Sequence, residues 1–264
     1  MKRLIAVALI AACGGAPKTP EHPIDNKPVV PAGPVELTTA EQVIEASLVS
    51  EGGRAKLGAL TSLRMVGTLT IAAAGLKGKI ETLSSPPNNT LSRLELPGIG
   101  TVEQGVHGDI AWEKSALSGA RVLSGIEKST SMREATFNGD LIWKKLFPKA
   151  ELKGVVKFEG TDCYKVELTA ADGQVQTRYY AKDTVLPIGL EMVSETQMGK
   201  IPVKVVSSDW REDNGYKFPH KVHHEEASQA IDIIIEKMET NVPIPPATFE
   251  PSDDIKQLAA AAAK

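Results

Sequence analysis

The feature that most constrains the fold is an alternation of apolar and polar residues that recurs along most of the chain. In segment 63–71, apolar residues or glycine occupy every second position, and the positions between them are mainly polar. A period of two is typical of a β-strand with one face toward a core and the other toward water, because successive side chains point to opposite faces. The pattern therefore predicts a β-rich protein.

Segments with this pattern follow one another at short intervals. The first half holds them at 63–71, 76–83, 90–96, 100–107 and 110–113. The second half holds them at 151–159, 162–170, 174–182, 186–196, 201–210, 216–226 and 228–240. Asp172-Gly173 and Asn214-Gly215 are strong hairpin signals, because glycine supplies the positive φ that such turns require. A count of about eleven or twelve antiparallel strands predicts one strongly curved sheet, a barrel or a half-barrel.

Three regions depart from the alternation and predict helices. A first helix is expected from Thr38 or Thr39 to about Ser50, with Glu41 and Gln42 near the capping-box position, and a short helix follows over 54–60. Between 122 and 147 the apolar residues fit one or two helices, with a break at Asn138-Gly139. The last residues, 252–264, predict a short alanine-rich helix that would be marginal on its own.

The N-terminus resembles the signal of a bacterial lipoprotein. Lys2 and Arg3 precede an apolar stretch at 4–12, which is shorter than the roughly 20 residues of a bilayer-spanning helix. Ile10-Ala11-Ala12-Cys13 has the form of a lipoprotein cleavage box. In lipoproteins with such signals the cysteine becomes the new N-terminus and carries acyl chains, so Cys13 is the expected lipidation site and membrane attachment. The alternative is an ordinary secretory signal with an incidental cysteine.

The predicted organisation has four parts: a signal peptide at 1–13, a linker at 14–36, one folded domain at 37–250 and a tail at 251–264. The linker is rich in proline and has almost no periodic apolar residues. Such a composition is typical of an extended, solvated spacer. We therefore expect a tether that lets the folded domain stand off a membrane surface.

Composition and motifs argue against several classes of function. The formal net charge of −3 at pH 7 and the lack of a basic stripe argue against a nucleic-acid partner. No G-x-S-x-G, phosphate-binding glycine loop or H-E-x-x-H sequence occurs, so no catalytic residue and no cofactor are nominated and an enzyme is not expected. His220 and His224 would lie about 13 Å apart on one strand, too far to share a zinc ion, so no metal site is expected. Cys163 is expected to be a small buried hydrophobe.

Several short sequences resemble those of the bacterial outer-membrane lipoprotein-sorting family, the relatives of the carriers LolA and LolB. They are Glu51-Gly52-Gly53-Arg54, Cys163-Tyr164-Lys165-Val166, Arg178-Tyr179-Tyr180 and Ser208-Asp209-Trp210-Arg211. The resemblance covers roughly residues 39–249. It implies a mainly β fold with packed helices, in which a single antiparallel sheet of about eleven strands curves into an incomplete barrel with a helical lid. In the carriers, the concave apolar cavity holds lipoprotein acyl chains.

The alternating apolar residues would line one face of such a sheet, and they are the candidates for a ligand cavity. The candidates are Met65, Leu69, Tyr164, Val166, Leu168, Leu190, Met192, Ile231, Ile233 and Ile235. The alternative is that the helices cover this face completely and make an ordinary core, because periodicity does not distinguish a core from a pocket. Ile99, in a loop at 96–100, is a candidate for membrane contact through its resemblance to a protruding apolar loop of LolB-like proteins.

Two functions follow as hypotheses. The first is a membrane-anchored lipoprotein facing the periplasm that binds a lipid or lipoprotein acyl chains and serves lipoprotein sorting or envelope lipid handling. The second is an envelope-stress sensor or assembly module that recognises a protein partner, as RseB-like regulators do with the same fold. Gly14 follows the cysteine where an Asp would suggest inner-membrane retention, by resemblance to enteric lipoproteins, so the outer membrane is the expected location.

Overall fold

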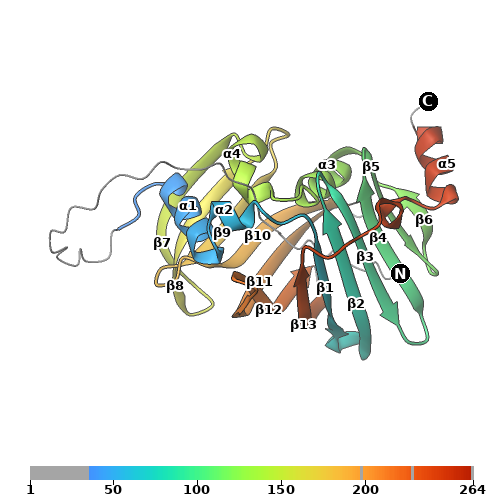
Figure 1. The fold of residues 1–264 in the computed structure, drawn as a ribbon, viewed down its shortest axis with the longest axis horizontal. Coiled ribbons are helices and arrows are strands. Elements are labelled where there is room, and N and C mark those ends of the chain that lie inside the picture. The colour runs from blue at the N-terminus through green and yellow to red at the C-terminus, as the bar shows by residue number, and fades with distance from the viewer. Residues whose placement is uncertain (1–35, 197–198, 227–228, 263–264) are drawn as a thin grey trace.

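The computed structural model describes residues 36–196, 199–226 and 229–262, so the cleavage box and Cys13 lie outside the described residues. In these described ranges, thirteen antiparallel strands form one sheet in the order β6-β5-β4-β3-β2-β1-β13-β12-β11-β10-β9-β8-β7. Figure 1 shows its arrangement. The sheet is not closed, and the predicted incomplete barrel with packed helices is confirmed. Within the described ranges, no helix has the length and apolar character needed to cross a membrane.

The strand count is a little higher than predicted, mainly because a short strand at Gly119–Val122 (β6) extends one edge of the sheet. Four residues are too few to show the alternation from which strands were predicted. The other strands are β1 Leu63–Ile71, β2 Leu76–Ser85, β3 Asn89–Leu96, β4 Gly100–His107, β5 Ile110–Ser115, β7 Lys149–Phe158, β8 Thr161–Thr169, β9 Val175–Ala181, β10 Pro187–Thr196, β11 Gly199–Asp213, β12 Tyr216–Glu226 and β13 Gln229–Thr240.

The sheet consists of two meanders that meet where the first strand pairs with the last. Strands β1 to β6 form one meander and β7 to β13 the other, and β1 pairs with β13. Since β6 and β7 are the opposite edges of the sheet, the chain between them has to cross from one edge to the other. That crossing segment contains the helices α3 (Gly125–Glu134), η2 (Gly139–Ile142) and α4 (Trp143–Leu146). Asn138, at the predicted break, adopts a left-handed conformation with φ 66°.

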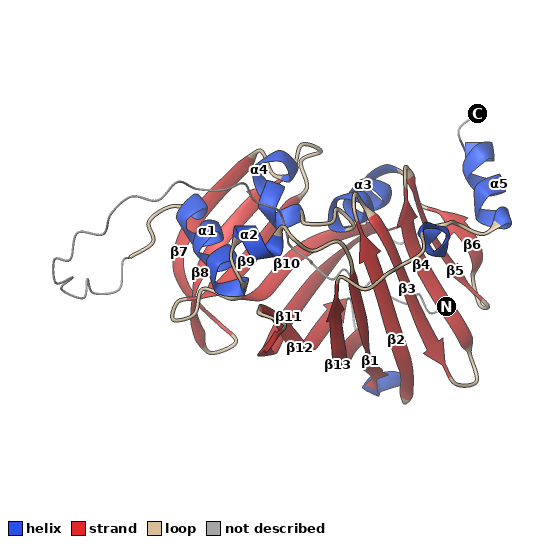
Figure 2. Cartoon of the chain, viewed as in Figure 1, coloured by secondary structure: helices blue, strands red, loops and turns tan. Residues whose placement is uncertain are grey.

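Two N-terminal helices share one face of the sheet with the crossing segment. Helix α1 (Ala40–Glu51) begins with a capping box and ends at Gly52. Of the predicted alternatives, Thr39 is the N-cap and Gln42 completes the box. A short helix, α2 (Arg54–Leu57), follows directly. Figure 2 shows α1, α2, α3 and α4 gathered along one side of the sheet. We call the face on which they pack the inner face, and the helices together form the lid.

The opposite, outer face is partly covered by the C-terminal segment. A 3-10 turn, η3 (Pro246–Phe249), and helix α5 (Asp253–Ala262) follow β13, with η1 (Ala72–Ala74) the remaining short turn. Phe249 and Ile255 pack against Leu83, Leu91 and Trp112 in an outer core cluster. The predicted tail helix is therefore present, and it is docked through one buried isoleucine.

Candidate functional site

Eight of the expected cavity residues are packed into two core clusters on the inner face. The main cluster joins β1 and β13 to Leu48 and Leu57 of the lid helices, and the lid cluster joins β8 to Val43 and Ile44 of α1 and Trp143 of α4. Met65, Leu69, Ile231, Ile233 and Ile235 belong to the main cluster, and Tyr164, Val166 and Leu168 to the lid cluster. All of these side chains are at most 3% exposed.

The other two candidates, Leu190 and Met192, lie between the clusters. Both belong to β10 and are only partly buried, and among the described residues they belong to neither cluster. Leu190 pairs with Val205 and Met192 with Val203 on β11, so the four side chains share the inner face. We call these four residues the central patch. Val203 is 8% exposed and Val205 packs against the main cluster, so the patch adjoins that cluster on the β11 side. Sequence reasoning found its two members on β10 and missed the two on β11.

Polar residues border the central patch on both sides. On β9, Arg178 pairs with Leu190 and Gln176 with Met192. On the other side, His224 of β12 pairs with Val205, and Glu226 pairs with Val203. Directly paired residues of antiparallel strands point to the same face, so these side chains also face inward. The central patch is therefore an apolar strip between two polar borders.

Helix α3 lies close to β10, and polar contacts hold both of its ends. Toward β6, Arg121 donates two hydrogen bonds to the carboxylate of Glu127. Toward the β8–β9 turn, Ser129 Oγ donates to Asp172 Oδ2 at 2.7 Å, and Arg133 Nη1 lies 3.1 Å from the same oxygen. The apolar anchor of this helix is small: Ala135, directly after it, is buried with Val106, Ala111 and Leu123, and Met132 packs against them. Residues 126–134 are only partly buried.

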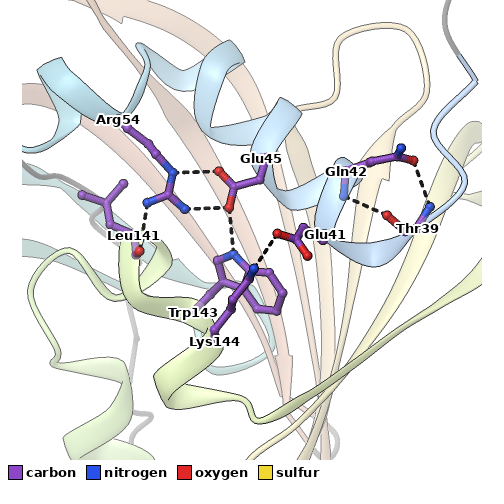
Figure 3. A network of polar contacts seen from close by, with 8 residues as sticks. All are labelled: Thr39, Glu41, Gln42, Glu45, Arg54, Leu141, Trp143 and Lys144. Atoms are coloured by element: carbon purple, nitrogen blue, oxygen red, sulfur yellow. Dashed lines mark hydrogen bonds and ion pairs between the residues drawn. The ribbon is translucent and has the colours of Figure 1, made fainter. Parts of the chain in front are cut away.

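A network of ion pairs and hydrogen bonds clamps the N-terminal helices to the crossing segment (Figure 3). Arg54 of α2 binds the Glu45 carboxylate of α1 through Nε at 2.7 Å and Nη2 at 2.6 Å, and its Nη1 donates to the Leu141 carbonyl at 3.0 Å. Trp143 Nε1 donates to Glu45 Oε1 at 3.1 Å, and Lys144 pairs with Glu41. The hydrogen bond from Arg54 lowers the pKa of Glu45. The two parts of the lid are thereby joined into one unit.

A buried ion pair connects the crossing segment to the sheet. Arg178 Nη1 of β9 donates to Asp140 Oδ1 of η2 at 2.6 Å, and both side chains are at most 10% exposed. The Arg178 guanidinium also lies over the Phe147 ring, 5.6 Å from its centroid. Nearby, loss of hydration, followed by the charge of Asp140, raises the pKa of Glu51 to about 8. The lid thus covers a small polar centre within an otherwise apolar face.

Two polar groups of this centre remain without a hydrogen bond of good geometry. Among the buried side chains of the described residues, Arg178 Nε and Tyr180 Oη have no such partner, and neither does His224 Nε2 across the patch. Arg178 and Tyr180 are two residues apart on β9, so both face inward. The Tyr180 hydroxyl lies beside the guanidinium, and burial raises its pKa to about 12. It therefore carries its proton at neutral pH.

The other residues singled out in the sequence lie away from the patch or take structural roles. His220 Nδ1 contacts the Ile235 carbonyl and its Nε2 contacts Asp213, while His223 contacts Asp232 on the outer face. Cys163 is buried in an outer cluster, and burial raises the pKa of its thiol. Ile99 is partly buried against the main cluster, and its membrane contact stays a prediction.

The sequence contained a weak signal for the polar centre. By the alternation of side chains along β9, Arg178 occupies an inward-facing position. A buried arginine needs an oppositely charged or hydrogen-bonding partner. The partner, Asp140, is 38 positions away in a segment without β alternation, so no sequence pattern links the two. Glu51 carries no sequence signal for this centre beyond its place in the short motif Glu51-Gly52-Gly53-Arg54.

No protein-family model and no curated protein sequence matches the chain, but several solved structures share its fold. A DUF1329 family protein from Desulfovibrio piger is 17% identical, covers 80% of this chain and 97% of its own, and has a TM-score of 0.56. A LolA superfamily protein from Nitrosomonas europaea is 16% identical, with coverage of 81% and 99% and a TM-score of 0.55.

A third structure is an outer membrane lipoprotein-sorting protein domain from Vibrio parahaemolyticus. It is 11% identical, covers 80% of this chain and 97% of its own, and has a TM-score of 0.53. At such identities the likeness concerns the arrangement of the backbone, not the chemistry of a site. The comparisons and the sheet topology agree that this chain has a LolA-like fold.

Proposed function

We propose that this protein is a binding protein of the bacterial envelope that holds a lipid, or the acyl chains of a lipoprotein, on the inner face of its half-barrel without covalent catalysis. The observation that carries the proposal is the central patch. Leu190 and Met192 present apolar surface inside the lid without belonging to either core cluster. A sheet face with apolar side chains of this kind is suited to a hydrocarbon chain.

The chemistry of the patch favours a flexible aliphatic ligand over a flat aromatic one. Its side chains are a leucine, a methionine and two valines, and a methionine adapts readily to irregular partners. Binding would be driven by removal of apolar surface from water, worth about 25 cal/mol per Å². No polar chemistry is required for this step.

Helix α3 is the part of the lid best suited to admit such a ligand. Apart from the small apolar anchor at Met132 and Ala135, its attachments are largely ion pairs and hydrogen bonds, of which Lys128 with Asp109 is an exposed example. Exposed pairs contribute about 0–1 kcal/mol each. Displacing α3 therefore costs less than displacing α1, which places Val43, Ile44 and Leu48 in the core.

The proposed location is the outer membrane, facing the periplasm, with attachment through acylated Cys13 and the linker at 14–36. The support for this placement is the sequence resemblance of the signal and of Gly14. A tethered domain reaches only as far as its linker allows. We therefore propose a receiver of lipid or lipoprotein at the membrane rather than a carrier that diffuses across the periplasm.

Native mass spectrometry of the purified full-length protein tests the proposal. We expect an acyl lipid to co-purify with the protein as a non-covalent ligand. Met192→Trp should reduce the bound fraction at least tenfold, because the larger side chain occupies the central patch. Val193→Trp is the matched control, since Val193 is the next residue on β10, lies on the outer face and is 45% exposed.

Two results would contradict the proposal. One is a protein that co-purifies with no acyl lipid and does not take one up from detergent-dispersed lipid. The other is an equal loss of ligand in Met192→Trp and Val193→Trp, which would mean that occupancy does not depend on the inner face.

A further inference from the structure

The polar centre beside the central patch has the composition of a hydrogen-bond site. Arg178 and Tyr180 are 6% and 1% exposed, and the Tyr180 hydroxyl interacts with the Arg178 guanidinium. Even so, Arg178 Nε and Tyr180 Oη make no hydrogen bond of good geometry among the described residues, so the Nε–H and the hydroxyl proton remain available. An N–H of arginine is only a donor, and a tyrosine hydroxyl that keeps its proton is a donor as well. Buried donors of this kind are nearly always paired in proteins. The centre is therefore suited to an acceptor oxygen.

The position of these donors sets where the oxygen would sit relative to the hydrocarbon. Arg178 pairs with Leu190, and Tyr180 pairs with Pro187 at the start of β10. The next inward pair in the same direction along the two strands is Gln176 with Met192. A ligand with its polar head at Tyr180 and Arg178 would therefore place its chain over Leu190 and then Met192.

The charges around the centre determine whether it favours a neutral or an ionised acceptor oxygen on a ligand. The positive charge of Arg178 is already balanced by Asp140 at 2.6 Å. Glu51, whose carboxyl accepts a hydrogen bond from Ser47, has its pKa raised to about 8 by loss of hydration and by Asp140, so it is mostly protonated at neutral pH. An environment that favours the protonated form of the Glu51 carboxyl also disfavours binding of an anionic ligand group. The acceptor that fits is an uncharged carbonyl.

We propose that Arg178 Nε and the Tyr180 hydroxyl form a hydrogen-bond site for the uncharged carbonyl of an ester-linked acyl chain, whose hydrocarbon lies along the central patch. This inference rests on the function proposed above and narrows its ligand class to acyl esters, as opposed to free fatty acids. It also gives Tyr180 a role in ligand selection, whereas Tyr179, its neighbour, lies on the outer face and donates to Glu191.

Isothermal titration of the delipidated full-length protein with methyl laurate and with laurate, at pH 7.4, tests the inference. We expect the ester to bind about tenfold more tightly than the ionised acid. Tyr180→Phe should weaken ester binding about three- to tenfold, the usual effect of losing one uncharged hydrogen bond, and leave laurate binding almost unchanged. Tyr179→Phe should alter neither affinity.

A second variant, Arg178→Lys, keeps the charge opposite Asp140 but removes Nε, and we expect it to lower the preference for the ester without unfolding the protein. Circular dichroism would verify folding of each variant.

Equal affinities of ester and acid, unchanged by Tyr180→Phe, would overturn this inference and leave the proposed function standing. Tighter binding of laurate would overturn it as well, in favour of an anion site. Binding of neither compound would contradict the proposed function itself.

Discussion

At the scale of single residues, Arg178 and Asp140 form an ion pair in which the two side chains are only 8% and 10% exposed. It joins strand β9 to η2 with both side chains nearly excluded from water. A buried pair adds little to stability compared with apolar residues of the same volume, but removing one partner leaves a buried charge at a cost of about 3–5 kcal/mol. Because Arg178 belongs to β9 and Asp140 to η2, the pair ties the crossing segment to the sheet.

Glu51 leads to a prediction about pH. Its pKa is about 8 in the folded protein and 4.5 as the ordinary value, so the folded state holds a proton that the unfolded state has released. Between about pH 5 and pH 8, the free energy of unfolding should therefore fall as the pH rises, by roughly 1 kcal/mol per pH unit. Glu51→Gln should flatten this profile and raise stability at pH 8, as measured by urea unfolding across the pH range.

The remaining slope in that variant has an identifiable source. Loss of hydration raises the pKa of Glu134 to about 7, so this carboxyl adds a second contribution of the same sign between about pH 5 and pH 7. In the double variant Glu51→Gln, Glu134→Gln, the free energy of unfolding should depend still less on pH. A Glu51→Gln profile parallel to that of the wild type would show that the carboxyl ionises freely in the folded protein.

At the scale of elements, local signals predicted helices and strands where local chemistry decides them. The capping box of Thr39 and Gln42 starts α1, and the break at Asn138 divides the crossing segment. By contrast, β6 has too few residues for a periodic signal and exists because β5 offers it a partner. The irregular register of β1 against β13, between Val66 and Gly67, is also a property of the pair of strands and not of either one alone.

Gly67 is the residue on which that strand pairing depends. A Cβ at this position would lie 2.3 Å from the Ile234 carbonyl oxygen, a backbone atom of the neighbouring strand that cannot rotate away. We expect Gly67→Ala to reduce the free energy of unfolding by about 1–3 kcal/mol, the usual cost of overpacking. Urea unfolding measures the change, and an alanine variant as stable as the wild type would show that β1 and β13 separate without cost.

At the scale of the whole molecule, the two meanders depend on contacts between distant parts of the chain. The first and last strands pair in the middle of the sheet, and the crossing segment spans the inner face between its edges. On the other face, the C-terminal segment covers apolar residues of β2, β3 and β5. A sheet edge or face exposed by the loss of such a cover promotes association between molecules.

Ile255 tests how much the C-terminal segment contributes. Its side chain is 0% exposed, whereas Leu258 on the same helix is 41% exposed. Ile255→Ala should lower the free energy of unfolding by about 2–5 kcal/mol, as expected for a truncated core residue, and Leu258→Ala by much less. Thermal unfolding of both variants gives the comparison. Equal effects would mean that α5 is not part of the cooperative fold.

The sequence by itself determined the β character, the helical segments and the residues that face inward, because alternation, caps and turn residues act over a few neighbouring positions. The tertiary structure decided which of those inward residues became core. Met65 and Ile233 are closed off by the lid, while Leu190 and Met192 remain between two clusters beside Arg178. That outcome depends on where the crossing segment lies and on contacts such as Arg178 with Asp140, made between residues far apart in the chain.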